Sequence, residues 1–289
     1  MVGTVFVASV LALAGCSSNN SSGPPCVPEV KPAKVDAIAN LLPDNIKQAG
    51  KLVVGVDATY APNEFKDKDG NVVGFDVDLL NAVAAPLGLK LDCRVSAFDK
   101  IIPSIQGKAY DMGMSSFTDN KEREIQVDFV DYFQAGTLWA QRPGAPIDPN
   151  NACGKKVAVQ TATVQDTEEL PAKNATCSKA GQPAINVIKF DGQDAVTNAV
   201  TLGQADAMTA DYPVTAYAIK NSEGKLEAAG QQFESAPYGW PVAKGSSLGQ
   251  ALLKALEHVI QTGEYKQILS RWGVDNGAID KPTINGAVS

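Results

Sequence analysis

The chain has 289 residues, of which 44% are hydrophobic and 20% are charged, as in ordinary soluble proteins of one or two domains. Its formal net charge of −7, without any run rich in Lys or Arg, disfavours nucleic acid and anionic membrane surfaces as partners. The one histidine, His258, and five cysteines without a CxxC pair give no basis for a zinc site or a histidine-activated nucleophile. We therefore expect neither a metal nor another cofactor.

The N-terminal segment predicts export. Residues 1–16 are apolar but too few to span a bilayer as a helix, and they end in two small residues before Cys16. This ending is similar to a lipoprotein signal peptide, in which Cys16 would carry the lipid; an ordinary secretory signal is the alternative. Signal peptides begin with a basic region, which is missing here, so a true start upstream of Met1 stays open. Residues 17–40, which open with SSNNSSGPP, are predicted to form a flexible tether.

From residue 51 onward, short apolar runs alternate with segments of helical spacing. The first half predicts a strand over 51–56, a helix over 75–87, a strand over 90–95, a helix over 101–107 and a strand over 109–114. The first strand leads into a loop over 57–65. In open α/β sheets, ligands bind at the carboxyl ends of the strands, so this loop is a candidate binding segment.

A second series follows the Pro- and Gly-containing segment 142–146, which marks a boundary. It predicts a strand over 155–160, a helix over 163–170, a strand over 185–190, a helix over 194–202, a strand over 206–210 and a helix opening at Tyr212. Apolar residues from Leu248 to Ile260 recur at helical spacing, and Gly263 ends that helix. The alternation of strands and helices in both halves predicts two α/β units.

The most informative stretch is 114–129, MSSFTDNKEREIQVDF, at the end of a predicted strand. Hydroxyl groups come first, at Ser115, Ser116 and Thr118, and Arg123 follows where a helix should begin. The guanidinium fork of an arginine binds a carboxylate through two parallel charge-assisted hydrogen bonds. The alternative is an exposed arginine in a charged surface turn, where ion pairs contribute little.

This stretch resembles the ligand-clamp segment of the extracytoplasmic solute-binding proteins that deliver polar amino acids to ABC importers. Further pieces resemble the same family in the same order: KLVVGVDATYAPNEF, GNVVGFDVDLLNAV, FDKIIPSIQGKAYD, GKKVAVQTATVQD, LGQADAMTADYP and GSSLGQALLKALEHVIQTGEYKQILSRWG. The resemblance, which covers residues 41–274, implies a periplasmic-binding-protein-like α/β fold. Two α/β domains would be joined by a two-strand hinge, with the ligand cleft between them. Domain 1 would comprise 41–137 plus 238–289, and domain 2 would comprise 138–237.

The resemblance also implies how a free amino acid would be held. Arg123 would bind the α-carboxylate, and Ser116 and Thr118 would complete the contacts from the first domain. Asp211 would pair with the ammonium group, because a buried charge without a partner is costly. The alternative for Asp211 is an ordinary helix N-cap.

The second domain would contribute a segment at a helix N-terminus, where free amides face a carboxylate. By resemblance, its contacts are Gln160, Thr163 and Val164. Ala162 stands where the family has glycine, so its methyl group would limit how closely the backbone can approach the ligand.

The side chain of the ligand would lie against Tyr60 and Phe98, which stand where the family has aromatic walls; burial in the core is the alternative for both. Asp57 would contact the far end of the ligand side chain. A carboxylate there suits an amide, imidazole, guanidinium or ammonium group and repels a second carboxylate. We therefore expect a polar or basic amino acid rather than aspartate or glutamate.

The implied function is to bind a polar or basic L-amino acid and deliver it to an ABC permease. The protein would be a lipid-anchored monomer on the extracytoplasmic face of the cell membrane. A sensor that presents the state of its ligand to a membrane signalling partner would have the same cleft. An enzyme on the same scaffold is a third alternative, but we expect no catalysis, because no histidine accompanies the cleft carboxylates.

Disulfides are expected in an exported protein. Besides Cys16, the sequence has Cys26, Cys93, Cys153 and Cys177, which allow three pairings. We favour the within-domain pairs 26–93 and 153–177, because a bridge between the domains would lock the hinge.

Overall fold

The computed structural model describes residues 34–287. Its helices are α1 (Asp36–Ala39), α2 (Asp44–Ala49), α3 (Phe75–Leu87), α4 (Phe98–Gln106), α5 (Lys121–Glu124), the π-helical turn η1 (Gln165–Glu169), α6 (Leu170–Lys179), α7 (Gln193–Thr201), α8 (Tyr212–Asn221), α9 (Ser247–Gln261), α10 (Glu264–Trp272) and the 3-10 turn η2 (Asp275–Gly277). Its strands are β1 (Lys51–Val56), β2 (Thr59–Tyr60), β3 (Glu64–Lys66), β4 (Val72–Val73), β5 (Lys90–Val95), β6 (Met112–Gly113), β7 (Val127–Gln141), β8 (Lys156–Gln160), β9 (Asn186–Phe190), β10 (Ala207–Asp211) and β11 (Glu227–Ala243).

One mixed sheet runs through the molecule in the order β5-β1-β6-β11-β7-β10-β8-β9. We call the part built on β5, β1 and β6 the first lobe, and the part built on β10, β8 and β9 the second lobe. Within each lobe the short strands are parallel, as the alternation of strands and helices predicts. β2, β3 and β4 form a separate small antiparallel sheet.

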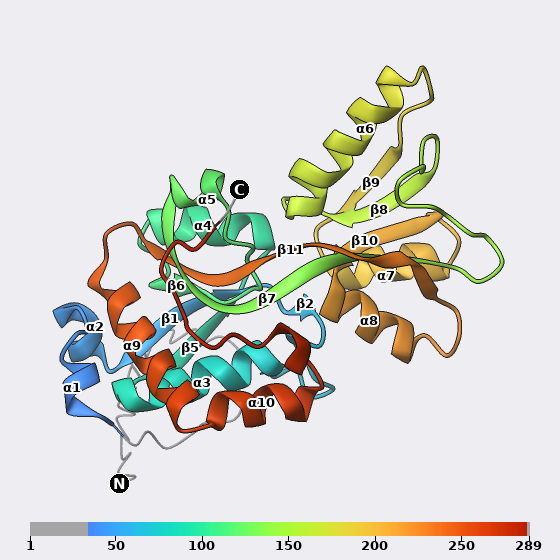
Figure 1. Cartoon of the computed structure of the whole chain (residues 1–289). Helices are drawn as coiled ribbons and strands as arrows, with labels where there is room; N and C mark the ends of the chain where they lie inside the picture. The colour runs from blue at the N-terminus through green and yellow to red at the C-terminus, as the bar shows by residue number, and fades with distance from the viewer. Residues whose placement is uncertain (1–33, 288–289) are drawn as a thin grey trace, which may run out of the picture.

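Two long antiparallel strands, β7 and β11, pass from one lobe to the other (Figure 1). They have 15 and 17 residues, which is well above the usual length of a strand. These are the two connections that the sequence predicted, and the periplasmic-binding-protein-like fold is confirmed. The predicted domain boundaries, after residues 137 and 237, fall inside these strands, and their position stays a prediction.

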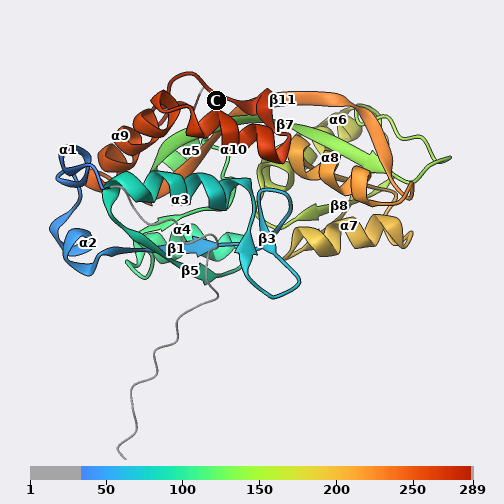
Figure 2. The ribbon, with the colours of Figure 1, turned by 90° about the horizontal axis from the view of Figure 1, so that it is seen from below.

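Each lobe buries apolar side chains on both faces of its part of the sheet. In the first lobe, α3, α9 and α10 cover one face, and they lie together in Figure 2, whereas α4 covers the other. In the second lobe, α6 covers one face, and α7 and α8 cover the other. α9 has the predicted pattern, since its buried residues recur every three or four positions: Leu248, Ala251, Leu252, Ala255, Leu256 and Val259.

Several elements differ from the predicted ones. The end of the predicted tether forms α1, which contacts α3 and buries Ala39; residues 1–33, with the predicted signal peptide and Cys16, lie outside the described residues. The strand predicted over 109–114 is limited to β6, because residues 107–111 turn back after α4. The helix predicted over 163–170 opens as the π-helical turn η1 and continues as α6.

The disulfide predicted between Cys153 and Cys177 is confirmed, and it ties α6 to the segment before β8. Cys93 on β5 is also disulfide-bonded. Its predicted partner, Cys26, lies outside the described residues, so the 26–93 pairing stays a prediction.

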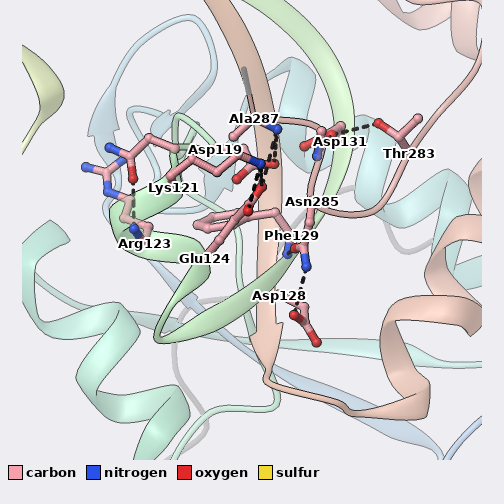
Figure 3. A network of polar contacts seen from close by, with 12 residues as sticks. Asp119, Lys121, Arg123, Glu124, Asp128, Phe129, Asp131, Thr283, Asn285 and Ala287 are labelled. Atoms are coloured by element: carbon pink, nitrogen blue, oxygen red, sulfur yellow. Dashed lines mark hydrogen bonds and ion pairs between the residues drawn. The ribbon is translucent and has the colours of Figure 1, made fainter. Parts of the chain in front are cut away.

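The C-terminal residues 283–287 lie along β7, and we call them the C-terminal strap (Figure 3). The amide of Gly286 donates to Asp131 at 3.0 Å, and the amide of Ala287 donates to Asp119 at 3.2 Å. The Thr283 hydroxyl donates to the same Asp131 oxygen at 2.8 Å. The strap thereby connects β7 with the loop that precedes α5.

Candidate functional site

A cavity between the lobes brings together all ten residues predicted for ligand binding. Its volume is about 290 Å³, including space open to solvent. The predicted residues on its wall are Asp57, Tyr60, Phe98, Ser116, Thr118 and Arg123 from the first lobe, and Gln160, Thr163, Val164 and Asp211 from the second. Ser115 and Gln165 complete the lining. Because both lobes contribute, the site exists only when they face each other.

Arg123 lies across the cleft and contacts both lobes. One guanidinium nitrogen donates to the carbonyl of Thr118 at 2.8 Å, and the other donates to the carbonyl of Ala162, in the second lobe, at 3.0 Å. The guanidinium carbon lies 5.5 Å from the ring centroid of Phe98 and 5.6 Å from that of Phe117. Aromatic faces stabilise a cation at these distances. Since a guanidinium has five N–H donors, donors remain for a carboxylate in the cavity.

Asp211 supplies a buried carboxylate at the end of β10. Although it stands at the N-cap of α8, its side chain makes no capping hydrogen bond. Its oxygens accept instead from Gln165 Nε2 at 2.8 Å and from the Tyr238 hydroxyl at 2.6 Å. Burial raises the pKa of Asp211, while these bonds, a bond with Tyr60 and the charge of Arg123 oppose the rise. The structure therefore disfavours the simple capping role and turns this carboxylate toward the cavity.

Asp57 is the second carboxylate on the wall, at the carboxyl end of β1. Its backbone amide donates to Ser115 Oγ at 3.1 Å. One carboxylate oxygen accepts from Thr59, and the other accepts from Gln160 Nε2 of the second lobe at 2.7 Å. Burial raises the pKa of Asp57 to about 6, although the hydrogen bonds act in the opposite direction.

Ser116 is hydrogen-bonded to buried polar side chains that do not line the cavity. Its φ of 50° is a left-handed conformation, which is uncommon for a residue with a side chain. Its hydroxyl accepts from Asn63 Nδ2 at 2.8 Å and donates to Glu64 Oε2 at 3.1 Å. Burial raises the pKa of Glu64 well above its usual value, and the charge of Asp76 adds to this shift. Asn63 and Glu64 thus support the site from outside the cavity wall.

The second-lobe loop after β8 turns through Ala162, whose φ is 65°. Glycine adopts this conformation without strain, which explains the glycine of the resembled family. The hydroxyl of Thr163 donates to the carbonyl of Gln160 at 2.9 Å, and the amide of Ala162 donates to Asp166 at 3.0 Å. These bonds fix the loop so that Thr163 and Val164 face the cavity.

Two residues of the wall, Ser115 and Gln165, are not among the predicted ligand contacts. Ser115 begins the hydroxyl run of the stretch 114–129, so its position beside Ser116 was the available signal. Gln165 carried no such signal, because its role depends on Asp211, which is 46 residues further along the chain.

Within residues 34–287, no group of three or more His, Cys, Asp or Glu side chains could hold a metal ion. Over the same residues, no helix is long and apolar enough to cross a membrane.

The fold and the charged cleft define a two-lobed α/β protein that binds a small ligand between its lobes. The chain belongs to the bacterial extracellular solute-binding proteins, family 3, whose model matches residues 52–275. This confirms the family that the motifs indicated.

Named relatives and a solved structure are similar over most of their length. The arginine-binding protein ArgT of Corynebacterium glutamicum is 38% identical over 283 residues, which are 97% of this chain and 93% of that protein. The ABC transporter glutamine-binding protein GlnH of Bacillus subtilis is 28% identical over 276 residues, or 91% and 93% of the two chains. An ancestral arginine-binding protein bound to arginine superposes with a TM-score of 0.70 at 35% identity, and the match covers 77% of this chain and 98% of that one.

Proposed function

We propose that this protein binds a free polar or basic L-amino acid, with a basic one favoured, and delivers it to an ABC importer. The observation that carries this proposal is the placement of Arg123, Asp211 and Asp57 on the wall of one cavity between the lobes. A basic amino acid has one negative and two positive groups. The cavity offers one positive and two negative partners, so each charge of the ligand would find an opposite one.

In the proposed complex, Arg123 pairs with the α-carboxylate and Asp211 with the ammonium group. The side chain lies between Tyr60 and Phe98, with its polar end toward Asp57. Aspartate or glutamate would place a second carboxylate beside Asp57, which is unfavourable at neutral pH. That the named relatives include arginine-binding proteins supports a basic ligand.

Delivery to an importer follows from the family and from the two-lobed architecture. Ligand favours the closed arrangement because it contacts both lobes, and a membrane partner can distinguish closed protein from open protein. A sensor would use the same closure. Transport is favoured over sensing, because one of the named relatives is an ABC transporter protein.

Catalysis is not part of the proposal. The single histidine, His258, lies on α9 and is not on the cavity wall. Asp57 and Asp211 accept hydrogen bonds from neutral side chains, an arrangement suited to pairing with a cation.

We also propose that a lipid on Cys16 anchors the protein to the extracytoplasmic face of the cell membrane. The protein would act there as a monomer. The support for anchoring is the small-residue motif before Cys16. Replacing Cys16 by Ser should release the protein from the membrane fraction into the medium. Retention of this variant in the membrane fraction would count against the anchor.

Isothermal titration calorimetry of the fragment from Ser17 tests the ligand. We expect binding of arginine, lysine, ornithine, histidine or glutamine, and no comparable binding of aspartate or glutamate. R123A and D211N should each weaken binding by at least about tenfold, since charge-assisted hydrogen bonds contribute roughly 1.5–3 kcal/mol.

Two exposed charges provide matched controls. R271A on α10 and D194N on α7 remove the same charges outside the cavity and should leave the affinity unchanged. If no amino acid binds, or if R123A and D211N bind as tightly as these controls, the proposed function is wrong.

A further inference from the structure

Asn120 begins the helix that carries Arg123. It is the N-cap residue of α5, and only 6% of its surface is exposed. Its side-chain oxygen Oδ1 accepts a hydrogen bond from the backbone amide of Arg123 at 2.8 Å. An N-cap of this kind orients the first turn of a helix, so Asn120 sets where the backbone of Arg123 lies.

The other end of the same amide contacts the second lobe. Nδ2 of Asn120 donates to Oε1 of Glu168 at 2.6 Å. Glu168 belongs to η1, whereas Asn120 belongs to the first lobe. The negative charge of Glu168 also stabilises the charged guanidinium of Arg123, because it opposes the fall in the pKa of Arg123 that burial causes. One planar amide therefore connects the helix of Arg123 with the opposite lobe.

The turn η1 also holds the second charged group of the cavity. Gln165, at its start, donates to Asp211 at 2.8 Å, while Glu168, near its end, accepts from Asn120. Glu169 accepts from Trp139 and Thr209, which fixes the turn to the strands of the second lobe. A π-helical turn is rare and is frequent at functional sites. Here the turn contacts Asp211 directly, through Gln165, and it contacts Asn120, which caps the helix of Arg123, through Glu168.

We propose that Asn120 is a positioning residue that couples closure of the lobes to the orientation of Arg123. When the lobes close, Glu168 fixes the amide plane of Asn120, and the other end of that plane holds the amide of Arg123. When the lobes open, the hydrogen bond to Glu168 is lost, whereas the cap remains. This inference rests on the proposed function, because it concerns how the amino acid, once bound, is retained.

The test exchanges the donor and the acceptor of this pair. N120D keeps an oxygen that can cap α5, but it places a second carboxylate against Glu168. E168Q keeps an acceptor for Asn120. The double variant N120D/E168Q restores one donor and one acceptor, in the opposite direction. E257Q, on the surface of α9, removes the same charge far from the cleft and serves as the control.

Stopped-flow fluorescence with arginine as the ligand measures the dissociation rate constant. We expect N120D to raise this constant about tenfold, in line with the loss of a hydrogen bond to a charged group. E257Q should remain within about threefold of the wild type. E168Q should raise the constant less than N120D does, because it keeps the hydrogen bond to Asn120 and loses only the charge near Arg123. N120D/E168Q should return to within about threefold of E168Q. The melting temperature of the ligand-free protein should stay the same in all variants, because the cap is kept.

Equal rate constants for N120D and N120D/E168Q would overturn the inference, and so would an unchanged rate constant in N120D. A fall in the melting temperature of ligand-free N120D that the double variant does not correct would assign Asn120 a purely structural role. These results differ from failure of the proposed function, in which the wild-type protein itself binds no amino acid.

Discussion

The charged side chains of the cavity are each held by neighbours before any ligand is considered. Arg123 donates to carbonyl groups of both lobes, and Asp211 accepts from Gln165 and Tyr238. Because these bonds already restrict the charged side chains, less side-chain entropy is lost when a ligand binds. They also fix the direction of each charge. The site therefore depends on the shape of the surrounding backbone as much as on the identity of the charged residues.

Ala162 illustrates this dependence, because its left-handed φ of 65° is strained for any residue with a Cβ atom. We expect A162G to raise the free energy of unfolding by up to about 1 kcal/mol, since relief of roughly 1–2 kcal/mol exceeds the entropy cost of a glycine. Urea unfolding measures the change. A172G, within α6, is the control and should lower the free energy of unfolding by about 1 kcal/mol. Equal destabilisation by both variants would contradict this account.

Asp57 should make the binding of basic ligands depend on pH. Burial raises its pKa to about 6, so it loses its charge as the pH falls through that value. The affinity for arginine should therefore fall about tenfold between pH 7 and pH 5, because a cation favours the ionised form.

Glutamine separates this effect from titration of Asp211, since it shares the carboxylate and ammonium groups but has a neutral side chain. Calorimetry at both pH values should show a smaller change for glutamine, and D57N should remove the difference between the ligands. The same pH dependence for both ligands in the wild type would show that Asp57 does not contact the side chain.

At the scale of elements, the loop over 115–120 is held in place by hydrogen bonds to three separate parts of the chain. Ser116 contacts the buried Glu64, and Asn120 caps α5 and bonds to Glu168. Asp119 binds the C-terminal strap through the amide of Ala287 (Figure 3). A change in any of these supports should reach the cavity through the loop.

Protonation of Asp119, which binds the C-terminal strap, should affect the free energy of unfolding. Burial raises its pKa to about 8, and the charges of Asp131 and Glu124 add to the rise. The folded protein therefore binds a proton that the unfolded chain has lost above about pH 4. This contribution to stability is fully present below that pH and is lost as the pH rises through about 8.

We expect the melting temperature of the wild type to include a decline over this pH range, and D119N to reduce the decline. D128N is the control, because the pKa of Asp128 is shifted in the opposite direction. Burial alone would raise this pKa, but hydrogen bonds from Asn285, Gly245 and Lys244 lower it. The stability that Asp128 contributes is therefore lost as the pH falls. Parallel pH profiles of D119N and the wild type would refute the role of Asp119.

At the scale of the whole molecule, the lobes are connected in two ways. β7 and β11 join them covalently, and hydrogen bonds join them across the cleft, including Gln160 to Asp57 and the amide of Gln193 to Thr59 Oγ1 at 3.0 Å. The strands allow hinge motion, whereas the cleft contacts exist only while the lobes are closed. A ligand that contacts both lobes therefore shifts the population toward the closed form.

Small-angle X-ray scattering should detect this shift. We expect saturating arginine to reduce the radius of gyration of the wild type, and the scattering profile then to match the structure described here. R123A should keep the larger radius at the same arginine concentration, while R271A should behave as the wild type does. A radius that does not change when calorimetry shows binding would argue against closure as the mechanism.

The sequence determined the local features and, through its motifs, the family. Strands and helices followed from apolar spacing, and the order of the motifs indicated two lobes, a cleft and ten wall residues. These signals are contained in short stretches, because periodicity and turn chemistry act over a few residues.

Only the tertiary structure decided how the distant stretches meet. It showed that Gln165 binds Asp211, that Asn120 faces Glu168, and that the C-terminal strap binds Asp119. It also replaced a predicted helix start with the π-helical turn η1 and placed α1 against α3. These features depend on contacts between residues far apart in the chain, and such contacts leave no periodic signal in the sequence around either partner.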